Sequence, residues 1–310
     1  IARERGLQLD MQGYEKNMQQ QRERARDASR FGEGYDAALD VKSSSAFTGY
    51  NHLQEKSTVT EIFRDNQPVQ TLNEGERGIL FLNETPFYAE SGGQVGDTGL
   101  IKNSKFEFEV SDTQKKSDAH AHIGKLIKGS VSVGDDVEAE INQHRRENIV
   151  LNHSATHLMH AALREVLGKH VQQKGSLVAP DRLRFDFSHD APVSSAELYK
   201  IEQIVNTEIR KNTPAQAQIM DKDKAMAAGA MALFGEKYGD EVRVLSIGDF
   251  SVELCGGTHV DRAGDIGLFK IISESGVASG IRRIEAVTGE HAFNWIQDVL
   301  NDYQQTAKIL

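Results

Sequence analysis

The sequence contains very little cysteine and no long apolar segment. Its 310 residues include one cysteine, Cys255, which cannot form a disulfide within the chain, and such a composition is typical of a cytosolic protein. No run of 18 or more apolar residues occurs, so we predict no transmembrane helix. The first residues lack an initiator Met and a signal-peptide pattern, and we interpret them as the middle of a longer polypeptide.

An excess of positive charge is also missing. The chain has 36 Lys and Arg residues against 46 Asp and Glu residues, a net charge of −10. A field of that sign opposes indiscriminate binding to nucleic acid, so any such contact must use local basic patches. The candidates are Arg145, Arg146, Lys174, Arg282 and Arg283, with solvated surface charge as the alternative for each.

The first half of the chain predicts a helix followed by a small β-barrel. Residues 8–30 are polar and contain no proline, which favours an exposed helix. Between about 38 and 140, short segments of alternating apolar and polar residues are separated by Gly, Asn and Asp, a pattern typical of a small barrel. The clearest predicted strands are 57–63, 77–82, 106–110 and 135–141.

The second half mixes helices and strands, so the predicted fold class is α+β. Residues 145–168 have the apolar spacing of a long amphipathic helix, and Ser194 and Ser195 mark the start of another. Further predicted elements are strands at 182–188, 242–247, 250–255 and 267–276, a short helix at 224–239 and a helix from 291. We expect a helical linker at 1–36, a barrel at 37–142, an α+β domain at 143–290 and a second linker at 291–310.

Two histidines stand four residues apart in the first of these helices, in "HSATH" at 153–157. A helix turns once in about 3.6 residues, so His153 and His157 point to one side and can bind one metal ion. The spacing is poorly specific, because eleven histidines in 310 residues produce roughly 0.4 such pairs by chance. His160, which follows on nearly the same face, is interpreted as an ordinary helix residue.

The single cysteine repeats this spacing. Cys255 is followed four residues later by His259 in "ELCGGTH", a placement that chance would produce in roughly 4% of cases. Two glycines between them allow the backbone to turn sharply. Thiolate and imidazole are preferred zinc ligands, and four of them match tetrahedral geometry, so we predict one zinc ion held by both pairs. A small buried cysteine at the end of a strand is the alternative.

Several other enzyme signatures are absent. There is no H-E-x-x-H, so the helix offers no adjacent carboxylate base of the zincin type, and the zinc deaminase pattern is missing too. The glycine-rich "SGGQ" at 91–94 is neither a Walker A loop nor a dinucleotide fingerprint. This loop is either a tight hairpin between barrel strands or a loop that approaches another backbone or a nucleotide, with Gln94 hydrogen-bonding.

With these motifs in hand, the sequence strongly resembles the editing region of the alanyl-tRNA synthetase family. The resemblance covers nearly the whole chain. It rests on "FYAESGGQVGD", "LNHSATHLMHAALR", "QKGSLV", "MALFGEKYGD" and "LCGGTH", in that order. The paired H-x-x-x-H and C-x-x-x-H also occur in threonyl-tRNA synthetases, but the "SGGQ" loop on a preceding barrel points to the alanyl branch.

The resemblance implies a translation-protein-like β-barrel followed by an α+β zinc-dependent editing domain in the cytoplasm. It implies hydrolysis of tRNA(Ala) mischarged with serine or glycine, with zinc held by His153, His157, Cys255 and His259. ATP and Mg²⁺ would serve an aminoacylation domain that lies outside this chain, and oligomerisation would use a C-terminal region outside it. The expected partner is the tRNA(Ala) acceptor end, with neither DNA nor a membrane.

The resemblance also assigns roles to further residues. Gln173 matches the editing-pocket glutamine of the family and is a candidate contact of the aminoacyl group, as is Thr156 beside the second histidine. Gln94 is expected near the tRNA acceptor end or between the two domains. Three alternatives stay open: a tRNA-binding module in which zinc only stabilises the fold, an editing domain of the threonyl type, and a generic zinc hydrolase, which the missing carboxylate base disfavours.

Overall fold

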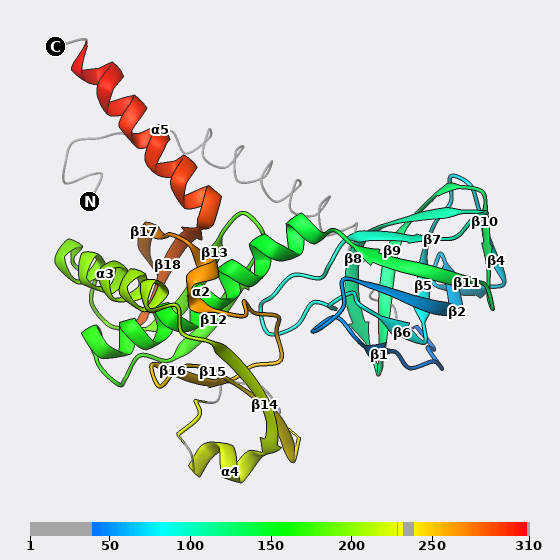
Figure 1. The fold of residues 1–310 in the computed structure, drawn as a ribbon, viewed down its shortest axis with the longest axis horizontal. Helices are drawn as coiled ribbons and strands as arrows, with labels where there is room; N and C mark the ends of the chain where they lie inside the picture. The colour runs from blue at the N-terminus through cyan, green and yellow to red at the C-terminus, as the bar shows by residue number, and fades with distance from the viewer. Residues whose placement is uncertain (1–38, 228, 232–238, 309–310) are drawn as a thin grey trace.

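The chain folds as a β-barrel followed by a mixed α/β unit (Figure 1). The computed structural model describes residues 39–227, 229–231 and 239–308. The helical linker that we predicted at 1–36 therefore lies outside the described residues. None of the helices in the described part is both long and apolar enough to cross a membrane.

Six antiparallel strands close the barrel. The strand order is β11-β7-β8-β9-β5-β2, and β11 also pairs with β2, which closes the ring. Side chains along a strand point alternately to its two faces, so each strand can give one face to the barrel interior. In β11, every second residue is buried and the others face outward. The inward residues include Leu80, Phe108 and Ala139, which form one apolar core. The strands of this unit are β1 (Ala46–Phe47), β2 (Gln54–Arg64), β3 (Gln67–Val69), β4 (Thr71–Asn73), β5 (Arg77–Leu82), β6 (Glu84–Thr85), β7 (Gly99–Lys102), β8 (Glu107–Lys116), β9 (Ala119–Lys128), β10 (Ser130–Ser132) and β11 (Asp136–Ile141).

A single long helix, α2 (Gln143–Leu167), leads from the barrel into the second unit (Figure 1). It starts directly after β11, where the Asn142 side chain accepts a hydrogen bond from the Arg145 backbone N–H and caps the helix. With 25 residues it is about 38 Å long, since each residue adds about 1.5 Å. Its middle, from Asn152 to His160, is buried throughout, so His153 and His157 lie in the interior of the second unit.

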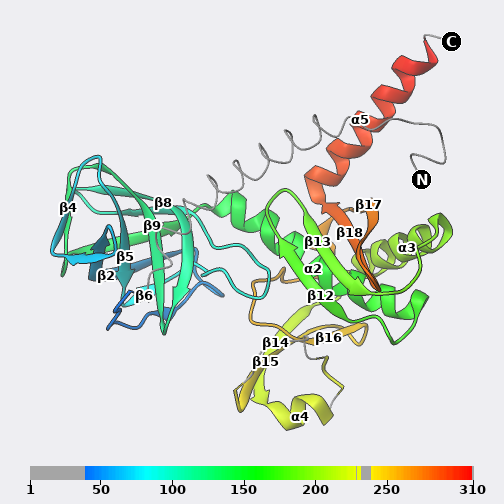
Figure 2. The same ribbon diagram turned by 180° about the vertical axis from the view of Figure 1, so that it is seen from behind.

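The second unit is built around a four-stranded antiparallel sheet with the order β12-β13-β18-β17. Helices α2 and α3 pack together against the face that carries Phe185, Phe187 and Ile271. A three-stranded sheet, β14-β15-β16, lies on the other side of α2, and α5 projects away from the unit (Figure 2). The elements are β12 (Gln173–Val178), β13 (Leu183–Ser188), α3 (Ser195–Lys211), β14 (Ala215–Asp221), α4 (Lys222–Ala227), β15 (Glu241–Ile247), β16 (Ser251–Leu254), η2 (Ala263–Ile266), β17 (Phe269–Ala278), β18 (Ile281–Thr288) and α5 (Gly289–Ala307).

The predicted α+β class and the barrel are confirmed. The strands and long helices that we predicted occur within a few residues of their predicted bounds. The helix predicted at 224–239 is only partly described: α4 ends at Ala227, and residues 228 and 232–238 lie outside the described part. Among the strands of four or more residues, β7, β9, β12, β14 and β18 were not predicted, although β9 and β14 both begin with regular alternation.

Candidate metal centre

Four side chains that are far apart in the sequence meet at one buried point. His153 and His157 come from successive turns of α2, and Cys255 and His259 come from the loop after β16. One ligand atom from each residue lies within 4.8 Å of all the others. The Cys255 Sγ lies 3.4 Å from Nε2 of His153 and 3.4 Å from Nε2 of His259. The structure thus brings together the four residues that the sequence predicted as metal ligands.

Two of the donor–donor distances match a tetrahedral metal ion, whereas the widest separation among the four donor atoms is up to 4.8 Å. Zinc binds nitrogen at about 2.0–2.1 Å and sulfur at about 2.3 Å, which separates neighbouring donors by about 3.4–3.6 Å. The observed sulfur–nitrogen distances of 3.4 Å agree. In addition, Nε2 of His157 is buried and has no hydrogen-bond partner within the protein. A buried imidazole nitrogen without a partner is costly unless it serves as a ligand.

The sharp turn between the two ligands of the loop requires glycine at one position. A Cβ on Gly257 would overlap the ring of His153 and would come within 2.9 Å of Oε1 of Gln94. The carbonyl groups of the turn are held from outside, because Arg243 donates to the carbonyls of Cys255 and Gly257 at 2.9 and 3.1 Å. The hydroxyl of Tyr50, which belongs to a barrel loop, donates to the carbonyl of Gly256 at 2.6 Å.

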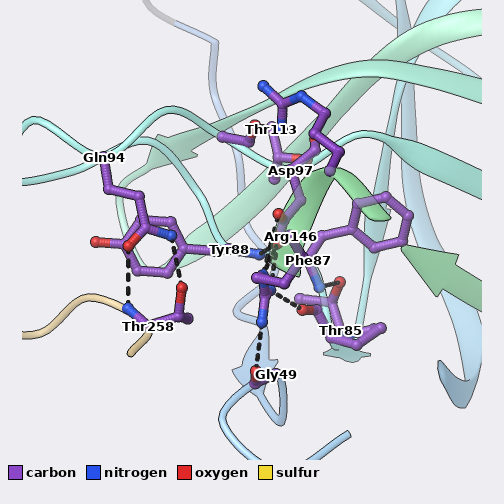
Figure 3. A network of polar contacts seen from close by, with 12 residues as sticks. Gly49, Thr85, Phe87, Tyr88, Gln94, Asp97, Thr113, Arg146 and Thr258 are labelled. Carbon is purple, nitrogen blue, oxygen red and sulfur yellow. Dashed lines mark hydrogen bonds and ion pairs between the residues drawn. The ribbon is translucent and has the colours of Figure 1, made fainter. Parts of the chain in front are cut away.

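Gln94 enters the metal centre from the barrel. Its side chain is fully buried, and its Oε1 accepts hydrogen bonds from Nδ1 of His153 at 2.7 Å and from the backbone N–H of Thr258 at 3.0 Å. Its Nε2 donates to the Thr258 hydroxyl at 2.9 Å (Figure 3). Because an amide oxygen only accepts, Nδ1 of His153 carries the proton and Nε2 is free to face the metal. Gln94 thus lies between the two units, and its amide group is occupied within the protein.

Glu253, in β16, is a site residue that we did not predict. Its carboxylate is buried and accepts from Nδ1 of His157 at 2.7 Å and from Nδ1 of His160 at 3.0 Å. Burial raises the pKa of this carboxyl group, but the two histidines outweigh that effect and hold the pKa at about 2. Strand alternation was the available signal, since Glu253 and Cys255 are two residues apart and therefore face the same side. His160, interpreted as an ordinary helix residue, belongs to this group.

The electrostatics of the cluster favour a thiolate. Burial raises the pKa of Cys255, but the imidazoles of His153, His259 and His157 hold it well below its usual value. Burial lowers the pKa of His259 to about 3. For His157, burial lowers the pKa, but the charges and hydrogen bonds of Glu253 and Cys255 together more than compensate and raise it to about 10. Metal ligands must be deprotonated, so metal binding here displaces a proton from His157.

Arg146 is buried, whereas a contact with a tRNA phosphate requires an exposed side chain. We predicted it at the tRNA surface, yet it is only 4% exposed and forms an ion pair with Asp97. It also donates to the carbonyls of Gly49 at 2.7 Å and Pro86 at 3.0 Å (Figure 3). These bonds attach the first turn of α2 to the barrel. The guanidinium therefore has no surface to offer to a nucleic acid, which contradicts the predicted role.

The other predicted basic residues lie nearer the surface. Arg282 forms a bidentate ion pair with Glu274, at 2.6 and 2.7 Å. Arg283 forms a bidentate ion pair with Asp186, at 2.7 and 2.8 Å. Arg145 donates to the carbonyl of Gly96 at 2.7 Å and is partly buried. Lys174 is exposed near the start of β12. Much of the charge of the two C-terminal arginines is thus neutralised locally.

The two predicted pocket residues lie on different elements, Thr156 on α2 and Gln173 on β12. Thr156 is buried, and its hydroxyl donates to the carbonyl of Asn152 at 2.8 Å, one turn back in α2. Gln173 is half-buried and is the first residue of β12. Their roles stay predictions.

A cavity of about 500 Å³ reaches the cluster. It lies between the barrel loop around Tyr50, the first half of α2 and strands β14 and β15, and His259 and Thr258 form part of its wall. The Arg243 guanidinium stacks on the Tyr50 ring, 4.3 Å from its centroid, at this wall. The metal centre is therefore buried on most sides and adjoins a space large enough for a small polar group.

Two regions of the chain match family models, and the whole chain is similar to a known protein. Residues 1–145 match the family model described as tRNA synthetases class II (A). Residues 242–285 match the threonyl and alanyl tRNA synthetase second additional domain. Over all 310 residues, the chain is 56% identical to a protein of Halorhodospira halophila named "Alanine--tRNA ligase", and it spans 36% of the length of that relative.

Proposed function

The chain belongs to the alanyl-tRNA synthetase family, and from this premise we propose that it carries the editing activity, the hydrolysis of mischarged tRNA(Ala). The proposed substrates are tRNA(Ala) bearing serine or glycine in place of alanine. We assign this activity to residues 143–290, and we assign the barrel at 37–142 to their support. In the parent protein, we expect attachment of alanine with ATP and Mg²⁺ to take place outside this chain, in the cytoplasm.

The observation that carries this proposal is the buried His₃Cys cluster beside a cavity. The cluster includes Cys255 and His259, which lie inside the region that matches the second additional domain. A site that removes a wrong amino acid needs its own chemistry, separate from that of the ligase reaction. A soft thiolate and three imidazoles form a donor set that suits zinc.

The need for a second site follows from the limits of binding. A pocket for alanine cannot strongly reject the smaller glycine, and serine adds only a hydroxyl group, so a single binding step discriminates by roughly 100-fold. Hydrolysis of the wrong ester in a separate pocket supplies the remaining accuracy. This pocket must accept serine and glycine and exclude alanine, for which we propose Gln173 and Thr156 as contacts of the aminoacyl group.

Bound zinc would supply a positive charge that orients and polarises the ester group. The protein itself holds the ligands in place: Gln94 fixes His153 and Glu253 fixes His157 through their Nδ1 atoms. Glu253 is not a suitable general base, because each of its oxygens accepts a hydrogen bond from a histidine. A hydroxyl group of the terminal ribose can accept the proton instead. Arg145, Lys174, Arg282 and Arg283 remain candidates for phosphate contacts.

The test is a deacylation assay with purified chain of known zinc content. We expect release of serine from Ser-tRNA(Ala), little release from Ala-tRNA(Ala), and loss of activity when zinc is removed by a chelator. Ser-tRNA(Thr) serves as the control for the threonyl-type alternative. If the chain binds tRNA(Ala) but releases no serine, it is a zinc-stabilised binding module and the proposal is wrong.

A further inference from the structure

We propose that Glu253 and His160 are positioning residues that act on the metal through His157. The inference rests on the metal site of the proposed function and adds two residues that bind no metal themselves. Glu253 is the central member: one carboxylate oxygen holds His157 at 2.7 Å and the other holds His160 at 3.0 Å. The chain of contacts thus runs from His160 through Glu253 to His157 and then to the metal.

The geometry fixes which nitrogen of His157 binds the metal. A carboxylate only accepts, so Nδ1 of His157 donates to Glu253 and Nε2 is the free atom, and this same Nε2 is buried without a protein partner. Carboxylates that accept a hydrogen bond from a metal-bound histidine orient its ring and raise its basicity. Because Glu253 is on β16 and His157 on α2, the hydrogen bond also sets the distance between the helix and the strand that leads to Cys255.

Charge balance gives Glu253 a second role. A divalent ion with three neutral imidazoles and one thiolate has a net charge of +1, which is costly to bury. Among the described residues, the buried carboxylates are Asp97 and Glu253, and Asp97 already pairs with Arg146. Glu253 is therefore the group that brings the buried site to electrical neutrality.

His160 completes the arrangement by holding the second oxygen of Glu253. Its ring packs on Phe185 with 5.1 Å between the ring centroids, a contact that an apolar side chain would make equally well. Its Nε2, however, is buried and has no partner, which lowers stability. The hydrogen bond from Nδ1 to Glu253 is the property that an apolar residue would lack. His160 thus keeps the carboxylate plane aligned with His157.

The experiment measures the zinc dissociation constant of the whole chain by competition with a chromophoric chelator, and the visible spectrum of the Co²⁺-substituted protein. The variants are Glu253→Ala, Glu253→Gln and His160→Phe, and His144→Phe is the matched control because His144 is exposed near the start of α2. We expect Glu253→Ala to weaken zinc binding by about 10- to 100-fold. We expect Glu253→Gln and His160→Phe each to weaken it by about 10-fold, with a changed Co²⁺ spectrum, while the control matches the wild type.

Wild-type zinc affinity in Glu253→Ala, or in both Glu253→Gln and His160→Phe, would overturn the proposal. If Glu253→Ala does not fold, the other two variants decide, since each preserves the size of the side chain. If the wild-type chain binds zinc and releases serine, and the variants bind zinc as tightly as the wild type, only the positioning role of Glu253 and His160 is wrong. A wild-type chain that binds no zinc removes both this inference and the metal site of the proposed function.

Discussion

Oε1 of Gln94, at the tip of a barrel loop, lies 2.7 Å from Nδ1 of His153, in the middle of the helix that carries two of the four candidate metal ligands. The same oxygen accepts a hydrogen bond from the Thr258 backbone, next to the ligand His259. The barrel therefore contributes a buried group that orients ligands of both pairs. The candidate metal centre is therefore formed by residues of both structural units.

Replacement of Gln94 by alanine is expected to weaken the metal centre. It leaves the Nδ1–H of His153 and the N–H of Thr258 buried without acceptors, which costs about 1–3 kcal/mol of stability for each unsatisfied group. Zinc affinity should fall by about 10- to 100-fold, because His153 loses its orientation. Chelator competition and urea unfolding measure the two effects. Gln143→Ala, at an exposed position, is the control, and equal zinc affinity in both variants contradicts this role of Gln94.

The two adjacent glycines of the metal loop should respond differently to alanine. A Cβ at Gly257 would overlap the ring of His153, whereas a Cβ at Gly256 would meet no atom within 4 Å. We expect Gly257→Ala to displace His153 and abolish tight zinc binding, and Gly256→Ala to retain it. Zinc content after dialysis distinguishes them directly. Equal zinc content in the two variants would show that the turn at Gly257 does not pack closely against His153.

Removal of Arg146 should affect stability rather than tRNA affinity. Arg146→Met leaves the Asp97 carboxylate buried without its partner, and breaking a buried ion pair in this way costs about 3–5 kcal/mol. The double variant Arg146→Met/Asp97→Asn should recover part of this loss. Arg145→Met, at the neighbouring position, should cost less. Urea unfolding gives the four free energies, and a normal stability of Arg146→Met together with a weaker salt dependence of tRNA binding would restore the predicted phosphate contact.

The barrel should lose stability in mild acid through His122. This histidine is fully buried, its Nδ1 donates to the Leu80 carbonyl at 2.9 Å, and burial lowers its pKa from 6.5 to about 3. The folded state therefore keeps His122 neutral, while the unfolded state takes up a proton below about pH 6.5. The contribution of His122 to the free energy of unfolding is therefore complete above pH 6.5. As the pH is lowered from 6.5 to 3, that free energy falls by about 1.4 kcal/mol per pH unit. In His122→Gln the free energy of unfolding should decline less steeply over this range, and an unchanged slope would exclude the assignment.

The four candidate ligands, which the structure brings together, could be picked out from the sequence because each pair is local. The step from His153 to His157 and from Cys255 to His259 is four residues in both cases, and residues so spaced act together within one turn of chain. The alternating pattern of β2, β8 and β11 likewise indicates the barrel, because alternation is a property of each strand by itself.

The partners of these ligands could not be predicted in the same way. Gln94 and His153 are 59 residues apart, and Glu253 and His157 are 96 residues apart, so no local pattern links them. For Arg146 the local pattern was misleading. Because Arg146 follows Arg145, the sequence suggested two surface charges. Its burial is apparent only in the folded protein, where it pairs with Asp97 of the barrel. Contacts of this kind depend on how the two units meet, which periodicity does not encode.

The most direct test of the account is serine release from Ser-tRNA(Ala) by Cys255→Ala, measured together with zinc content and the urea unfolding midpoint. Cys255 supplies the only thiolate of the cluster. The account predicts loss of zinc and of serine release in a chain that still unfolds cooperatively. Serine release at the wild-type rate by the zinc-free variant would contradict a metal-dependent editing site.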